Sequence, residues 1–218
     1  MTRVAVVGGH GQIARLLHPL LIDAGDQPVA LVRRQEHAEE LAAQGVETRI
    51  VDIEASDEAV FADAFAGCDA VVFAAGGGPD GNIERKRTVD LEGSLKSIAG
   101  ADRAGARRFV QVSAIGVDES VPADAGDVWQ AYVEAKRDAD AALRGSALDW
   151  TVLRPGRLTD DPATGQVTLG ARVERGDVTR ADVAAVIAAV LDDGRTVGRQ
   201  WNLVGGGTDA AAAIEAAL

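Results

Sequence analysis

The sequence predicts an α/β protein built on a doubly wound, parallel sheet with helices on both faces. Two observations predict this class. Short apolar runs alternate with amphipathic helical patterns five times between residues 4 and 113, without a break. The first of these runs also leads directly into a glycine-containing turn that opens a helix. Such an alternation forms parallel strands joined by right-handed helical crossovers.

Length and composition fit one domain over residues 1–218, which contains 47% apolar residues. No apolar run approaches the roughly 18 residues of a membrane span. The first apolar run ends at Val7, whereas the core of a signal peptide needs about 7–15 residues, so we expect a cytoplasmic protein. Cys68 is the single cysteine, which agrees with a reducing compartment.

The formal net charge of −12 disfavours partners that attract basic surfaces, namely nucleic acids and acidic membranes. We therefore expect a small-molecule substrate and a monomer or homodimer. The three histidines, His10, His18 and His37, lack the spacing of metal ligands, and we expect no metal.

The opening turn combines small residues at intervals of three, Gly8, Gly11 and Ala14, after an apolar strand over residues 4–7. Gly8 permits the sharp turn, Gly11 lets backbone N–H groups approach a pyrophosphate, and Ala14 lets the helix pack on the strand. The helix N-terminus adds free N–H groups and the positive end of its dipole. The pattern favours a dinucleotide site over an ordinary strand-to-helix turn.

Arg33 and Arg34 follow the second predicted strand, over residues 28–32. A dinucleotide-binding fold that uses NAD usually has an acid about 20 residues after the glycines, whereas an arginine there accommodates the 2′-phosphate of NADP. Arg33 lies 22 residues after Gly11, and no carboxylate lies between the start of the second strand and Glu36. This favours NADP over NAD, the alternative being two solvated loop arginines.

Two further strand ends lie at the carboxyl edge of the predicted sheet, where open parallel sheets bind ligands. Asp52, followed by Ile53, ends the third strand; it either bonds the adenine amino group or caps the helix that begins near Ser56. The fourth strand ends in a run of small residues, 74–78. Their size leaves room for a ribose and an adenine, unless they form only a flexible loop before Pro79.

The only tyrosine, Tyr132, precedes Lys136 by four residues on a predicted helix over residues 127–143, so both project from one face. A phenol has a reference pKa of about 10, which a nearby cation lowers by roughly 1–3 units. Lys136 would do this while bonding a nicotinamide ribose, and Tyr132 would pass a proton to a carbonyl oxygen. The alternative is a half-buried tyrosine beside a solvated lysine, but the helix follows the fifth strand and can face the nicotinamide.

The other elements are predicted in order along the chain. They are a helix at 83–104, a strand at 108–113, a loop at 114–124, a strand at 148–153, a turn at 154–156, a loop with a short hairpin at 164–165, a helix at 179–193, a strand at 200–204 and a helix at 209–218.

These motifs together resemble the short-chain dehydrogenases/reductases, specifically the small atypical members that are NAD(P)-binding, epimerase/dehydratase-like or NmrA-like. The resemblance covers essentially the whole chain and implies a seven-stranded Rossmann sheet with a dinucleotide across its carboxyl edge. It implies catalysis by Ser113, Tyr132 and Lys136. The cofactor-binding residues it implies are Gly8, His10, Gly11, Gln12, Ile13, Arg33, Arg34, Asp52, Ile53, Ala74, Ala75, Gly76, Lys136 and Pro155.

The chain departs from the family pattern in two places. The catalytic hydroxyl of the family usually lies one or two residues beyond Ser113, where this chain has Ala114 and Ile115, so Ser113 either touches substrate or bonds only to backbone. The substrate-side region at 154–178 is too short for a nucleotide-sugar cleft, which predicts a small or planar substrate.

The sequence therefore predicts an NADP-dependent oxidoreductase acting on a small carbonyl, quinone or flavin. Two alternatives remain open: a non-catalytic NADP sensor of the NmrA type, and an NAD(P)-dependent epimerase or dehydratase.

Overall fold

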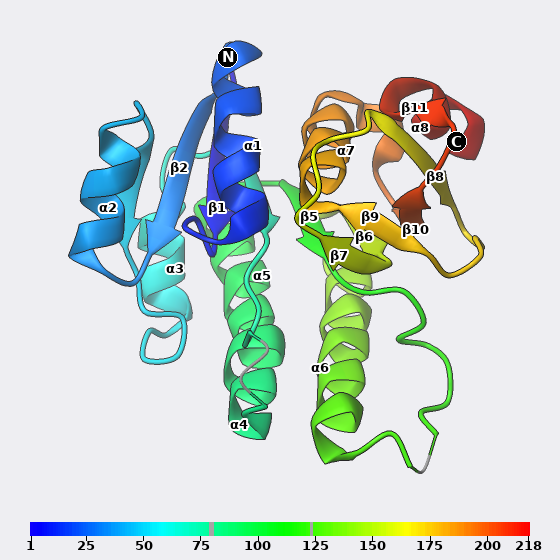
Figure 1. The fold of residues 1–218 in the computed structure, drawn as a ribbon. Helices are drawn as coiled ribbons and strands as arrows, with labels where there is room; N and C mark the ends of the chain where they lie inside the picture. The colour runs from blue at the N-terminus through cyan, green and yellow to red at the C-terminus, as the bar shows by residue number, and fades with distance from the viewer. Residues whose placement is uncertain (79–80, 123) are drawn as a thin grey trace.

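The central sheet has the order β11-β8-β10-β6-β5-β4-β1-β2-β3 within residues 1–78, 81–122 and 124–218, which the computed structural model describes (Figure 1). The seven strands from β10 to β3 are parallel. Strand β8 pairs antiparallel with β10, and β11 pairs antiparallel with β8. The predicted α/β class is confirmed. The predicted count of seven is wrong for the sheet as a whole, because two antiparallel strands extend the parallel part.

The elements alternate along the chain as the sequence predicts. The strands are β1 (Arg3–Val7), β2 (Gln27–Val32), β3 (Glu47–Ile50), β4 (Ala70–Phe73), β5 (Arg108–Val112), β6 (Asp149–Pro155), β7 (Arg157–Thr159), β8 (Gln166–Gly170), β9 (Asp177–Thr179), β10 (Arg199–Gly205) and β11 (Thr208–Asp209). The helices are α1 (Gln12–Asp23), α2 (Gln35–Ala42), α3 (Glu58–Ala64), α4 (Ile83–Arg85), the π-helix η1 (Lys86–Leu91), α5 (Glu92–Ala104), α6 (Asp127–Arg144), α7 (Arg180–Asp192), the 3₁₀-helix η2 (Gly194–Thr196) and α8 (Ala210–Ala217).

Each face of the sheet carries its own apolar core. Val4 and Val6 of β1 lie in a core with buried residues of α1, α7 and α8. Ala5 and Val7 face the opposite way, into a core with α3, α5 and α6. Because both faces are covered, the central strands carry apolar residues on both sides, as expected for a parallel sheet between helical layers.

The region after β6 differs from the prediction. The sixth strand runs on to Pro155, so Arg154 lies within it and is buried. The predicted hairpin at residues 164–165 is wrong. The backbone N–H groups of Thr164 and Gly165 donate to the carboxylate of Asp182 in α7, which fixes this turn from a distance, and the following strand β8 joins the main sheet. Strands β7 and β9 form a separate two-stranded parallel sheet.

The predicted helix at 83–104 forms as three consecutive pieces, α4, η1 and α5. Its middle part is a π-helix, a form that occurs mostly as single turns and often at functional sites. Pro79 and one residue of the predicted loop at 114–124, residue 123, lie outside the described residues. None of the described helices is both long and apolar enough to cross a lipid bilayer.

Candidate functional site

The turn between β1 and α1 has no space for a side chain at Gly8 or Gly9. Gly8 has a φ of +79°, and a Cβ built there would lie 2.8 Å from the Cα of Ala75. A Cβ on Gly9 would lie 2.6 Å from the Cβ of Ala30. The buried His18 ring fixes the turn through its Nε2, which lies 2.7 Å from the carbonyl oxygen of Gly9 and must donate to it.

The N-terminus of α1 is prepared for an anion. Its N-cap residue is Gly11, which offers no side-chain acceptor, and the first turn contains no acidic residue. The first N–H groups of the helix therefore lack a side-chain partner, and the positive end of the helix dipole is not offset.

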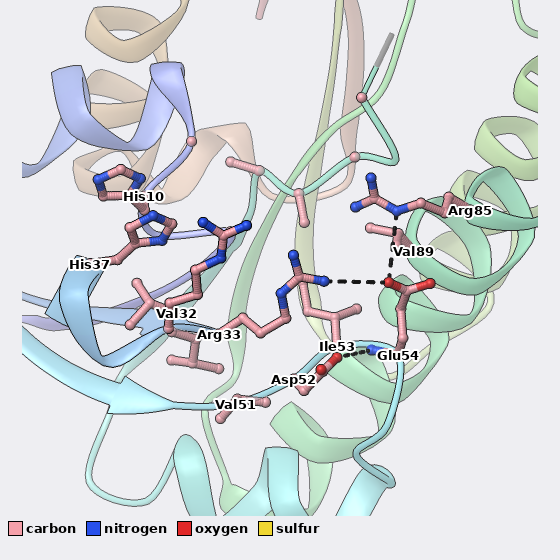
Figure 2. Close-up of a pocket in the computed structure, with 18 of the residues that line it drawn as sticks. His10, Val32, Arg33, His37, Val51, Asp52, Ile53, Glu54, Arg85 and Val89 are labelled. Atoms are coloured by element: carbon pink, nitrogen blue, oxygen red, sulfur yellow. Dashed lines mark hydrogen bonds and ion pairs between the residues drawn. The ribbon is translucent and has the colours of Figure 1, made fainter. Parts of the chain in front are cut away.

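A cavity of about 510 Å³, called here the turn cavity, opens beside this turn at the carboxyl ends of β1–β4 (Figure 2). Apolar side chains in its lining include Val32, Val51, Ile53 and Val89 (Figure 2). The structure brings eleven of the predicted cofactor residues together in its lining. They are Gly8, His10, Gly11, Gln12, Arg33, Arg34, Asp52, Ile53, Ala74, Ala75 and Gly76.

Basic residues gather at one end of the turn cavity. The Arg33 guanidinium, about half exposed, lies 3.8 Å from the Glu54 carboxylate, which Arg85 also approaches at 3.7 Å (Figure 2). On the other side, the rings of His10 and His37 stack with centroids 3.7 Å apart. Partial burial and the neighbouring His10 lower the pKa of His37.

Asp52 does not cap the helix that follows it, so that alternative is wrong. Asp57 caps α3 by accepting from the N–H groups of Ala59 and Val60. The Asp52 carboxylate instead accepts from the N–H of Glu54 at 2.9 Å and holds the turn after β3 at the cavity wall.

A second cavity of about 360 Å³, called here the central cavity, continues from the turn cavity and shares residues 74–76 and Gly78 with it. It holds Ile13, Ser113, Tyr132 and Lys136, so the three predicted catalytic residues line one space. The predicted cofactor residue Pro155 does not line it; Pro155 lies in a third cavity described below.

The Lys136 ammonium is buried and held by two oxygens. It lies 3.1 Å from Oδ1 of Asp90 and donates to the carbonyl oxygen of Val112 at 3.2 Å. Burial lowers the pKa of Lys136, but the charge of Asp90 and a hydrogen bond to it outweigh burial, and the pKa is raised. Lys136 is therefore a fixed cation, 6.0 Å from the centroid of the Tyr132 ring.

The pKa of Tyr132 is raised rather than lowered. Burial is the main cause, and the charges of Asp90 and Asp140 add to it, while Lys136 opposes them. The sequence-based expectation of a lowered pKa is wrong for this arrangement, because burial, with the charges of Asp90 and Asp140, outweighs the charge of Lys136. A phenol with a raised pKa remains protonated at neutral pH, so it carries a proton that it can donate.

The Ser113 hydroxyl bonds to a side chain, which differs from the alternative that it bonds to backbone. Its hydroxyl donates to Oδ2 of Asp140 at 2.8 Å. The fully buried Asp140 also accepts from Gln111 at 2.7 Å and from Nε of Arg154 at 2.9 Å. Arg154 in turn donates to Asp118 at 2.5 and 3.1 Å, and this hydrogen bond lowers the pKa of Asp118.

Sequence reasoning missed Asp90, Asp140 and Arg154. A signal existed for Asp140, which lies four residues after Lys136 and so on the same face of α6. No local signal marks Asp90, because its partner Lys136 is 46 positions away.

A third cavity of about 1000 Å³, called here the outer cavity, adjoins the central cavity and shares Lys86, Tyr132 and Leu158 with it. Its walls include residues 114–115, 125–129, 155–158 and 175–177. This volume lies at the upper end for small-molecule sites, since residues outside 154–178 contribute much of the wall. Among the described residues, no cluster of three or more potential metal ligands is present.

Comparison with known proteins agrees with this geometry. Residues 8–194 match the family model described as NAD(P)H-binding. The chain is 36% identical to "Uncharacterized sugar epimerase YhfK" of Bacillus subtilis (strain 168) over 98% of this chain and 99% of that protein. A solved structure from Bacillus halodurans, provisionally assigned as an NAD-dependent epimerase/dehydratase, is 37% identical with a TM-score of 0.90, covering 99% of this chain and 100% of the other. The oxidoreductase ylbE from Lactococcus lactis is 26% identical with a TM-score of 0.86, covering 98% and 95%.

Proposed function

The chain belongs to the NAD(P)H-binding family, as its sequence predicts, and we propose that it is an NADP-dependent reductase of a carbonyl, quinone or flavin. One observation carries this proposal. The phenol of Tyr132 lines both the central and the outer cavity, so it lies between the space continuous with the glycine turn and the space open to a substrate.

The residues of the turn and central cavities fit a dinucleotide. The uncapped N-terminus of α1 and the bare backbone at Gly8 and Gly9 would hold the pyrophosphate. The apolar side chains lining the turn cavity would contact the adenine, and Arg33 would bind the 2′-phosphate. When bound, NADPH supplies a hydride.

The chain's own residues supply the proton. Tyr132, protonated at neutral pH because its pKa is raised, donates its hydroxyl proton to the substrate oxygen. Lys136 stabilises the phenolate that remains, and Asp90 holds the Lys136 ammonium in place. Ser113 donates its only hydroxyl proton to Asp140, so in this arrangement it does not also donate to the substrate oxygen, and Tyr132 is the sole donor proposed.

Purified protein tests the proposal directly. Calorimetry should detect NADPH binding, and NADPH should be oxidised when carbonyls, quinones or flavins are added. If the protein binds neither NADPH nor NADH, the proposed cofactor site is refuted. Tight binding without turnover on any acceptor would refute the reductase and favour a cofactor-sensing protein.

Sugar epimerisation is a second candidate, favoured by the name of the Bacillus subtilis relative. The size of the outer cavity is compatible with a larger substrate than the sequence suggested. This candidate predicts a cofactor that stays bound through purification and no net NADPH consumption, so the same experiments separate it from the reductase.

Replacing Arg33 with alanine should weaken NADP binding by about 10-fold, because a charge-assisted hydrogen bond contributes roughly 1.5–3 kcal/mol and Arg33 is partly solvated. NAD binding should change by less than about 3-fold, since NAD lacks the 2′-phosphate. The two dissociation constants can be measured by calorimetry. Arg103→Ala is the matched control, because Arg103 is exposed, pairs with Glu58 and lines none of the three cavities. An equal loss for both cofactors would contradict the proposed role.

A further inference from the structure

Lys86 occupies a buried position between two cavities. It is the first residue of the π-helix η1 and is only 6% exposed. Its side chain lines both the central and the outer cavity. Its ammonium lies 5.9 Å from the centroid of the Tyr132 ring and donates to the carbonyl oxygen of Gly78.

No carboxylate neutralises Lys86 within the part of the chain that the structure describes. Of the other two lysines, Lys136 is buried but pairs with Asp90. Lys96 donates to two backbone carbonyls but is only partly buried, so water reaches it. Burying an ammonium without a counter-ion costs several kcal/mol. Lys86 is therefore placed to receive an anion from the cavity.

The arginines of the outer cavity do not offer an equivalent charge. Arg157 pairs with Asp177, Arg175 with Glu119 at 2.7 Å, and Arg180 with Asp160 at 2.8 Å. These three ion pairs lie toward the exposed part of the molecule, with at least one well-exposed partner each. Among the basic side chains that line this cavity, Lys86 alone lacks a carboxylate partner among the described residues and also adjoins Tyr132.

The surfaces around Lys86 are apolar and partly aromatic. Ile115, Val128, Trp129 and Leu158 line the outer cavity, and the Trp129 ring lies 5.5 Å from the Tyr132 ring, with the residue 45% exposed. Exposed aromatic surface at a cavity wall provides a face on which a flat molecule can stack.

We propose that Lys86 binds the carboxylate of the substrate, and that the substrate is an aromatic or conjugated carbonyl compound carrying that carboxylate near the reducible carbonyl. This inference rests on the proposed reductase function. Tyr132 faces the carbonyl oxygen, Lys86 fixes the acid group beside it, and Trp129 covers the flat body. The acidic protein thus selects an anionic substrate through one buried cation.

Matched acceptors test the inference: 3- and 4-carboxybenzaldehyde, each compared with its uncharged methyl ester. Wild-type protein should reduce at least one acid with a kcat/KM about 10-fold or more above that of its ester, as a charge-assisted hydrogen bond allows. In Lys86→Met, this ratio should fall to about 1. Lys86→Arg keeps the charge and should retain most of the preference. Lys96→Met removes the same charge from a lysine that lines no cavity and should keep the wild-type ratio.

A binding measurement separates this inference from the reductase proposal. With NADP present, calorimetry should show that benzoate binds wild-type protein at least 10-fold more tightly than benzamide, and that Lys86→Met abolishes the difference. If this holds without any turnover, the anion site stands and the reductase proposal fails. If the protein reduces acids and esters equally well, or Lys86→Met leaves the acid preference intact, the anion site is refuted and the reductase stands.

Discussion

Tyr132→Phe should lower kcat for the reductase reaction by about 10²- to 10⁴-fold, the usual contribution of a positioned general acid. The phenol is the proton donor in the proposed reaction, and phenylalanine keeps the ring that packs beside Trp129 while removing the proton. Steady-state NADPH oxidation with any acceptor that the wild-type protein reduces is the measurement.

The dissociation constant of NADP is the control for this substitution and should change by less than about 3-fold, because the glycine turn and Arg33 lie elsewhere. The pH profile gives a second check. Since burial raises the pKa of Tyr132, the wild-type rate should not fall until the pH exceeds the ordinary value of about 10. A Tyr132→Phe protein that turns over as fast as the wild type would eliminate the phenol as the acid.

Asp140→Ala should lower the free energy of unfolding by about 3–5 kcal/mol, the cost of removing one partner from a buried ion pair. The carboxylate of Asp140 is fully buried and accepts from Gln111, Ser113 and Arg154, so its loss leaves three donors without their partner. Total stabilities of about 5–15 kcal/mol make this a large fraction. Urea unfolding followed by tryptophan fluorescence is the measurement.

The same helix offers a matched control. Asp138 is exposed, and its only ion pair among the described residues is with the neighbouring Arg137 at 3.7 Å. Asp138→Ala should therefore change stability by no more than about 0.5 kcal/mol. A loss below about 1 kcal/mol for Asp140→Ala would show that water or a rearranged side chain replaces the carboxylate.

The parallel part of the fold was predictable because its signals are local. Each buried strand contains a run of apolar residues, and helices of seven residues or more follow in between. The glycine turn was also readable, since strand, small residues and helix are contiguous. The strand β8 and the turn at Thr164 were not, because an aspartate 18 residues later, Asp182, fixes that turn.

The candidate site likewise contains residues predictable from local spacing and others that depend on contacts between distant segments. Tyr132 and Lys136 share a helical face and could be paired from their spacing. The pKa of Tyr132 could not be predicted, because it depends on burial and on Asp90, which reaches Lys136 from another helix. The position of Lys86 depends on a π-helix, and the spacing of apolar residues along the chain does not reveal that change in backbone geometry.

Strand β3 forms one margin of the main sheet, and its residues Glu47 and Arg49 bear opposite charges. These side chains form an ion pair at 2.9 Å, and Arg3 of β1 adds a second contact to Glu47 at 2.8 Å. Charged residues on a terminal strand disfavour the addition of a strand from another molecule, since such pairing would strip water from them. Folded molecules should consequently resist growth into fibres along this border even when concentrated.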